Sequence, residues 1–220
     1  MSTTRHYSQL YRQLRSIDPR DHQRVIRTYE EREAEIGRLD TLEYFELTVY
    51  YVDALFATGA YREHQLVVDR VLETCILHNI RRVEGLEKDV FEHLLFSKAA
   101  SAYRTQNFPG AAHVLRELIG INPGEELNVR FLRAALFKLE VNLLQFGRAA
   151  FIFCMLLAAA LIVVELLVVR TLYENWVSAS QTAIAVVFLG GVLLLTLSYA
   201  LAYGRAHRAA YRFRATRANK

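Results

Sequence analysis

Two long apolar segments near the C-terminus, residues 149–169 and 180–203, constrain this chain more than any other feature. Each has about 20 residues or more, and an α-helix of that length, rising about 1.5 Å per residue, crosses a hydrocarbon core of about 30 Å. A short polar loop joins them. The sequence therefore predicts an integral membrane protein with a transmembrane helical hairpin over residues 148–204 and a basic tail over residues 205–220.

The basic tail and the region that precedes the hairpin differ in net charge. Residues 1–147 carry 19 Lys or Arg and 21 Asp or Glu, a net charge of −2, whereas residues 204–220 carry a net charge of +6. A nucleic-acid-binding domain usually carries a basic patch on a folded face. We therefore expect no nucleic-acid partner, and expect residues 1–147 to form one soluble domain.

Positive charge next to the apolar segments predicts their orientation. Arg148 precedes the first segment and the arginine-rich tail follows the second, while the loop offers Arg170 as its one cation and also contains Glu174. Because cytoplasmic flanks are enriched in Lys and Arg, both termini are expected in the cytoplasm. The two isolated cysteines make no disulfide framework, which fits a reducing compartment. The pattern is compatible with a bacterial inner membrane, where we expect the protein to lie.

The region before the hairpin has apolar residues at three- and four-residue spacing and no strand-like alternation, which predicts an all-α domain. Asp18 and Pro19 indicate a helix start. Asp40 and Glu43 resemble a capping box that opens the next helix. The expected product is a stack of antiparallel helix pairs, with helices at about 19–39, 41–57, 61–79, 84–106 and 108–121.

Two helix–turn–helix units resemble the tetratricopeptide repeat. The second unit carries the motif on Leu95, Ala99, Ala102, Tyr103, Phe108, Ala111, Leu115, Leu118 and Pro123; the first carries it on Val52, Leu55, Phe56, Gly59, Tyr61, Val68 and Val71. Tyr61 and Phe108 occupy equivalent places 47 residues apart, against a family period of about 34. His64 stands where the family prefers alanine. The resemblance covers about residues 41–123 and implies a solenoid that binds protein or peptide, with no catalytic activity; a generic helical bundle is the alternative.

The segment from about residue 125 contains no helix stop until residue 170, and it predicts a long helix that connects the domain to the hairpin. Its apolar residues follow a 3-4-3-4 spacing, as in coiled coils. Two interpretations remain open. The helix could pack with these apolar residues on the helical domain as its capping helix, or it could pair with copies of itself to give a homo-oligomer.

Glu165 is the candidate intramembrane functional residue, because ionisable side chains inside a span are rare. It lies about 7–8 Å from the end of its helix. A carboxylate at that depth could serve at the interface or in helix pairing, or it could line a pore in an oligomer. The candidate lipid-headgroup residues belong to the tail, although a mere topology signal explains them as well. They are Arg205, Arg208, Arg212, Arg214, Arg217 and Lys220.

Motifs for catalysis, phosphate binding or metal ligation are absent from the sequence. We therefore expect no enzyme activity, no catalytic residue, no metal and no cofactor. The expected function is that of a membrane scaffold or adaptor whose partners are the lipid bilayer and a protein or peptide. An oligomeric effector that forms a pore and a structural subunit of a larger complex are the alternatives. The candidate partner-binding residues are Tyr44, Tyr50, Tyr51, Tyr61 and Tyr103.

Overall fold

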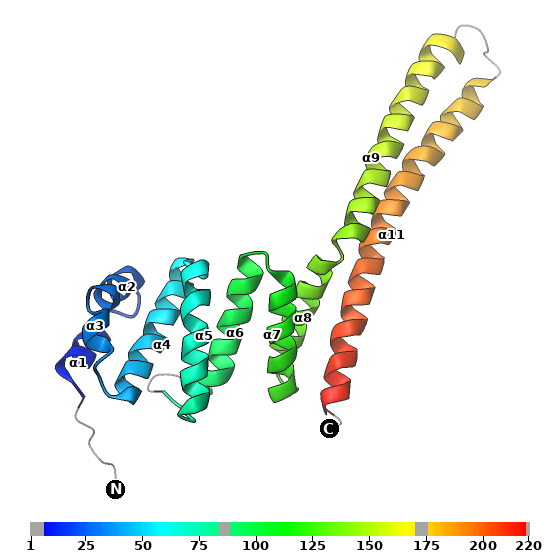
Figure 1. Cartoon of the computed structure of the whole chain (residues 1–220). Helices are drawn as coiled ribbons and strands as arrows, with labels where there is room; N and C mark the ends of the chain where they lie inside the picture. Colours follow the sequence, from blue (N-terminus) through cyan, green and yellow to red (C-terminus); the bar gives the residue numbers. More distant parts are fainter. Residues whose placement is uncertain (1–6, 84–88, 170–175, 219–220) are drawn as a thin grey trace. The chain divides into compact units, whose positions relative to one another are not determined.

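The computed structural model describes residues 7–83, 89–169 and 176–218 of the 220-residue chain (Figure 1). Every secondary-structure element within these ranges is a helix, so the predicted all-α class is confirmed. The chain divides into two compact units, which are described separately. One comprises Met1–Leu132 with Arg217–Lys220, and the other comprises Arg133–Thr216.

The helical unit, residues 7–132, begins with three short helices. They are α1 (Gln9–Arg15), α2 (His22–Glu31) and α3 (Glu33–Ile36). The expected helix start at Asp18 is wrong, because the Asp18 carboxylate accepts from the backbone N–H of Arg20 at 2.9 Å and closes a turn. Asp21 caps α2 instead, accepting from the N–H of Arg24. The single helix expected over 19–39 is therefore two, with a break at Arg32.

Helices α4 (Thr41–Thr58) and α5 (Tyr61–Leu77) form an antiparallel pair. Gly59 ends α4 in the left-handed conformation, with φ of 82°, which costs glycine little because it has no Cβ. The turn expected at this position is confirmed. The capping box expected at the start of α4 is wrong: Asp40 is the N-cap residue but makes no side-chain capping hydrogen bond, and Glu43 accepts from the N–H of Ser8.

Helices α6 (Val90–Arg104) and α7 (Phe108–Ile121) form a second pair beside α5 (Figure 1). The Asn107 side chain caps α7 by accepting from the N–H of Gly110 at 3.1 Å. Ala99, Ala102 and Ala111 are buried, and their small side chains allow the two helices to approach closely. Of the helix expected over 84–106, residues 84–88 lie outside the described part; Asp89 is the N-cap residue and the helix begins at Val90.

The long connecting helix expected from about residue 125 is interrupted. Helix α8 (Glu126–Leu139) ends one residue before α9 (Val141–Val164), and Glu140 leaves the helical region with ψ of 38°. The sequence contains no glycine or proline at this break. The Glu140 carboxylate lies 3.6 Å from the guanidinium of Arg205, so it is held in an ion pair outside the regular helix.

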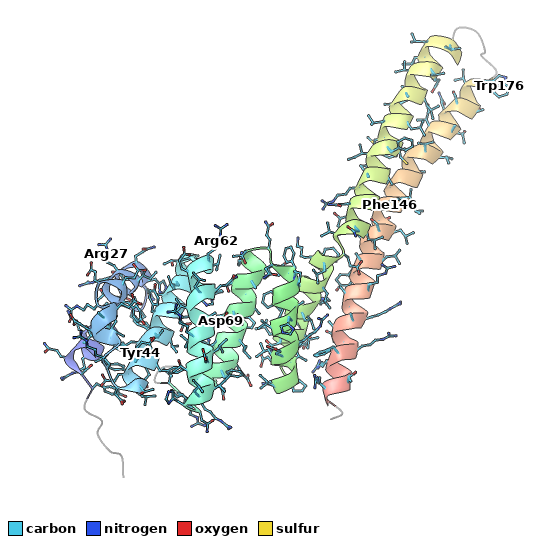
Figure 2. The ribbon with its side chains drawn as sticks, in the orientation of Figure 1. Arg27, Tyr44, Arg62, Asp69, Phe146 and Trp176 are labelled. Atoms are coloured by element: carbon cyan, nitrogen blue, oxygen red, sulfur yellow. The ribbon has the colours of Figure 1, made fainter. Side chains whose placement is uncertain are left out.

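The second unit is dominated by two long apolar helices that lie antiparallel (Figure 1). Helix α9 continues into a π-helical turn, η1 (Glu165–Val169), and its partner α11 runs from Val177 to Ala218. Both are long and apolar enough to cross a membrane. Large apolar side chains remain exposed in this unit, including Phe146 on α9 and Trp176 just before α11, each 67% exposed (Figure 2).

Small residues bring α9 and α11 together. A Cβ added to Gly191 would lie 2.7 Å from the Cβ of Cys154, and one added to Gly147 would overlap the Ser198 side chain. Glycine at both positions is therefore required by the close approach of the two helices. The contacts also fix the antiparallel register, since Arg148 donates to the Tyr199 hydroxyl at the same level as the Gly147 contact.

Candidate functional site

The tyrosines of α4 lie against the N-terminal helices. Tyr51 is 8% exposed, stacks on Tyr29 with ring centroids 4.1 Å apart, and donates from its hydroxyl to Glu30. Burial and the adjacent Glu30 carboxylate raise the pKa of Tyr51. Tyr44 and Tyr50 are half-buried and pack on the same core. These three side chains therefore belong largely to the packing between α4 and the short helices.

Tyr61 and Tyr103 lie at the turns of the two helix pairs. The Tyr61 ring meets Phe56 edge-on at 5.6 Å, and the Tyr103 ring meets both Phe108 and Phe131 at 5.2 and 5.3 Å. Both tyrosines are half-buried. The structure thus separates the five candidate tyrosines into the core beside α4 and two turn clusters, and their role in partner binding stays a prediction.

Two carboxylates on α4 are buried: that of Glu43, which was expected in a capping box, and that of Glu46, which the sequence did not single out. Glu43 and Glu46 are each 6% exposed. Glu43 accepts from the N–H of Ser8, and Glu46 accepts from the Tyr11 hydroxyl at 2.5 Å. Burial and the Glu46 carboxylate raise the pKa of Tyr11, which keeps its hydroxyl protonated and able to donate. The available signal was two acids in the first two turns of a largely apolar helix, and the hydrogen bonds suit a structural role.

A histidine pair lies between α4, α5 and α6. His64 is fully buried, and neither ring nitrogen has a hydrogen-bond partner. Burial lowers the pKa of His64 to about 4, so the ring is neutral at pH 7. His93 instead places Nε2 2.7 Å from the Asp53 carboxylate, and this hydrogen bond raises the pKa of His93. The pKa values of the two imidazoles therefore shift in opposite directions, because His93 is hydrogen-bonded to a carboxylate and His64 is buried without a hydrogen bond.

A small recess opens beside this pair, where α6, α7 and the start of α8 meet. Its volume is about 170 Å³. The residues that line it are Glu92, His93, Phe96, Leu118, Glu125, Leu127 and Asn128. Two carboxylates and an amide thus meet apolar side chains in one concave place, an arrangement typical of a site that recognises a polar group on an apolar stem. No single segment of the sequence indicates this recess, because its lining residues are spread over α6, α7 and the start of α8.

Glu165 is the first residue of the π-helical turn and is 5% exposed. Its carboxylate accepts from the Gln181 side chain across the hairpin, with Nε2 and Oε1 3.3 Å apart. The pair lies at one end of a groove of about 480 Å³ between α9 and α11, which is otherwise lined by apolar and small side chains such as Met155, Ala158 and Phe188. π-Helical turns occur frequently at functional sites. The sequence could indicate Glu165, but not Gln181 as its partner.

The arginines of the tail lie on a helix. α11 continues without a break from its apolar part through Arg217, and Lys220 lies outside the described residues. A helical rise of about 1.5 Å per residue places Arg217 about 18 Å further along the axis than Arg205. Since electrostatic attraction is screened over about 8 Å at physiological salt, the candidate headgroup residues are not equivalent along this axis.

No group of three or more His, Cys, Asp or Glu side chains placed to hold a metal ion occurs in the described part of the chain. Comparison with protein-family models, with curated proteins and with solved structures finds no match.

Proposed function

We propose that this protein is a membrane-anchored adaptor, in which the helical hairpin spans the bilayer and a tetratricopeptide-like domain binds a protein or peptide partner. The observation that carries the proposal is the exposure of the hairpin. Only 11% of the most apolar window of each long helix is buried within the protein. Apolar surface of that extent is stable in lipid and not in water, because its exposure to water is unfavourable.

The helical unit supports the binding half of the proposal. Helices α4 to α7 form two antiparallel pairs, and buried alanines bring α6 and α7 together at positions that the tetratricopeptide resemblance uses. Such stacks present extended surfaces to partners. Helix α8 lies in the sequence between these helix pairs and the apolar hairpin, and one residue separates it from α9.

The orientation and location are part of the same proposal. Arg148 and the arginines of α11 adjoin the same end of the hairpin, because Arg148 donates to Tyr199 near the start of the basic stretch. The rule that cytoplasmic flanks are positive puts both termini in the cytoplasm, as in a bacterial inner membrane. Arg205 and Arg208 adjoin the apolar part of α11 and are the strongest candidates for headgroup contact.

Site-directed labelling tests the anchor. Ser178 and Ala215 are exposed and lie near opposite ends of α11. In intact cells we expect a membrane-impermeant maleimide to label Ser178→Cys, and to label Ala215→Cys only after permeabilisation. The unmodified chain is the control, since Cys75 is buried and Cys154 is half-buried. Labelling of both variants from one side would exclude a hairpin that spans the membrane.

A pore is the second candidate, favoured by the buried Glu165–Gln181 pair within an apolar hairpin. Particle mass in lipid nanodiscs separates the candidates. An adaptor is expected as a monomer that binds its partner and leaves vesicles tight, whereas a pore requires an oligomer with a conductance that Glu165→Gln alters. A conductance lost in Glu165→Gln with intact partner binding would contradict the adaptor as the whole function. Stoichiometric membrane partners would instead indicate a structural subunit.

A further inference from the structure

The two helices of the hairpin contact each other closely through glycines over only part of their length. A Cβ on Gly147 would overlap the Ser198 side chain, and one on Gly191 would lie 2.7 Å from the Cβ of Cys154. Between Cys154 and the loop, the helices leave the groove of about 480 Å³, which side chains from residues 155–165 and 181–188 line. This hairpin groove therefore begins where the last of the two glycine contacts ends.

The length of the hairpin groove matches one leaflet of a bilayer. Its lining extends from Met155 to Glu165, which is about 15 Å of helical rise and half of a hydrocarbon core of about 30 Å. At the other end of the hairpin Arg148 donates to the Tyr199 hydroxyl, and about 26 Å of helical rise separates Arg148 from Glu165. The two polar contacts thus bracket an apolar length close to that of the core, and the groove occupies the half next to the loop.

The walls of the groove leave room for something narrower than a helix. Ala158 is buried, whereas Ala159 and Ala185 line the groove and remain exposed, so the groove is open to its surroundings. Its volume, spread over about 15 Å, gives a mean cross-section of about 30 Å², against about 80 Å² for a helix of about 10 Å diameter. A transmembrane helix of a second copy would rest on the rim, whereas a single hydrocarbon chain fits between the walls.

Gln181 places a hydrogen-bond donor at the loop end of the groove. Its Nε2 donates to Glu165 Oε1 at 3.3 Å, and an amide nitrogen carries a second hydrogen that can donate to another acceptor. Gln181 lies about 7–8 Å along the helix from Trp176, whose exposed ring suits the membrane interface (Figure 2). The interfacial layer on each side of a hydrocarbon core is about 5–8 Å thick. The amide therefore lies at the depth where the esters of lipids meet their hydrocarbon chains.

We propose that the hairpin groove binds one acyl chain of a membrane phospholipid from the leaflet next to the loop, with the ester carbonyl of that chain accepting from Gln181. The inference rests on the proposed span and adds a lipid site to it. An empty groove would leave its walls without atoms to contact, and a seated chain supplies those contacts. The contacts at Gly147 and Gly191 bring the helices together in the other half, so they exclude a chain of the opposite leaflet from between the helices there.

The test uses the full-length chain in nanodiscs of phosphatidylcholine. A small share of the lipid is a phosphatidylcholine that carries a photoreactive diazirine near the middle of one acyl chain. After irradiation, mass spectrometry of the peptides identifies the labelled residues. We expect labelling of the groove lining to exceed, by at least about threefold, the labelling of Leu156, Val163 and Val186. These three side chains are exposed at the same depth but do not line the groove.

Matched substitutions assign the labelling to the groove. Ala159→Phe fills it, whereas Ala160→Phe adds the same side chain at the next position, which is exposed and does not line the groove. Ala185→Leu and Ala183→Leu form a second pair on α11, and the comparison on the unmodified chain needs no variant. We expect Ala159→Phe and Ala185→Leu to lower the labelling of Ile162 by about tenfold, because the inserted side chain and the acyl chain cannot share the groove. The two control variants should leave the labelling of Ile162 unchanged.

Labelling spread evenly over the groove lining and the exposed residues outside it would overturn the inference, as would equal losses in both members of each pair. A dimer that Ala159→Phe, but not Ala160→Phe, converts to a monomer would place a second copy on the groove and would overturn it too. Failure of the proposed span is distinct, because Ser178→Cys and Ala215→Cys report on it. Cysteines labelled from opposite sides, without preferential labelling of the groove, would leave the span and remove the lipid site. Cysteines labelled from one side would remove the span whatever the groove binds.

Discussion

His64 should make the helical unit less stable in mildly acidic solution. The ring is fully buried without a hydrogen-bond partner, and burial lowers its pKa from 6.5 to about 4. The unfolded chain therefore binds a proton near pH 6.5 that the folded protein does not bind until about pH 4. Between pH 7 and pH 5 this difference costs about 2 kcal/mol of unfolding free energy, and below pH 4 it approaches about 3 kcal/mol.

The charged groups around His64 also affect how the stability of the protein depends on pH, so the contribution of His64 has to be separated from that of His93. The carboxylates of Asp53 and Asp69 raise the pKa of His64, whereas His93 lowers it. His93 acts on stability in the opposite direction: its own raised pKa contributes stability that is present below its unfolded pKa and is lost as the pH rises through its folded pKa. The pH dependence of the unmodified protein alone therefore mixes two opposing histidines.

His64→Leu separates them, because it removes the buried imidazole and leaves His93 in place. Urea unfolding of the full-length chain in detergent micelles, followed by far-UV circular dichroism, gives the free energy at pH 7 and pH 5. We expect the variant to be more stable at pH 7 by about 1–3 kcal/mol, the cost of an unpaired buried polar group. Its advantage should grow by about 2 kcal/mol at pH 5. An advantage that is the same at both pH values would refute the reasoning.

Two further substitutions test the packing of each unit. Gly191→Ala should lower the thermal stability of the hairpin by about 1–3 kcal/mol, because its Cβ would press on that of Cys154; Cys154→Gly should restore it, and Gly190→Ala, with no atom within 4 Å, is the control. Tyr11→Phe should destabilise the helical unit by about 1.5–3 kcal/mol in urea, because it removes a hydrogen bond from the buried carboxylate of Glu46. An unchanged midpoint in that experiment would mean that Glu46 finds another donor.

Much of the fold follows from local signals in the sequence. Gly59 ends α4, Asn107 caps α7, and the apolar periodicity between them predicts helices that the structure contains. The predicted start of α2 was wrong because Asp18, Pro19 and Asp21 lie close together and each suits a helix start or a turn. The Asp18 carboxylate accepts from the N–H of Arg20 and closes a turn, and this hydrogen bond depends on the local backbone geometry. The break at Glu140 was missed because no glycine or proline marks it, and the ion-pair partner of Glu140, Arg205, lies 65 residues away in the sequence.

The candidate sites likewise divide into one that a single segment of the sequence indicates and others that form only when helices pack together. Glu165 could be singled out because an acid in an apolar run is visible in one segment. The recess at Glu92 and Asn128 could not, since its residues are ordinary within their own helices and become a site only when α6 and α8 pack together. His64 was noted only as a departure from a repeat pattern, and its missing hydrogen bonds depend on the surrounding packing.

The unbroken course of α11 past Gly204 has a rotational consequence. Each residue of an α-helix turns the chain by about 100°, so the direction in which every arginine points is fixed relative to the apolar side chains of the same helix. One alanine inserted after Gly204 would rotate Arg205 and the arginines that follow it by about 100° around the helix axis, and would leave the number of arginines unchanged. The direction around the helix axis in which the positive charges point is thus set by the apolar part of α11.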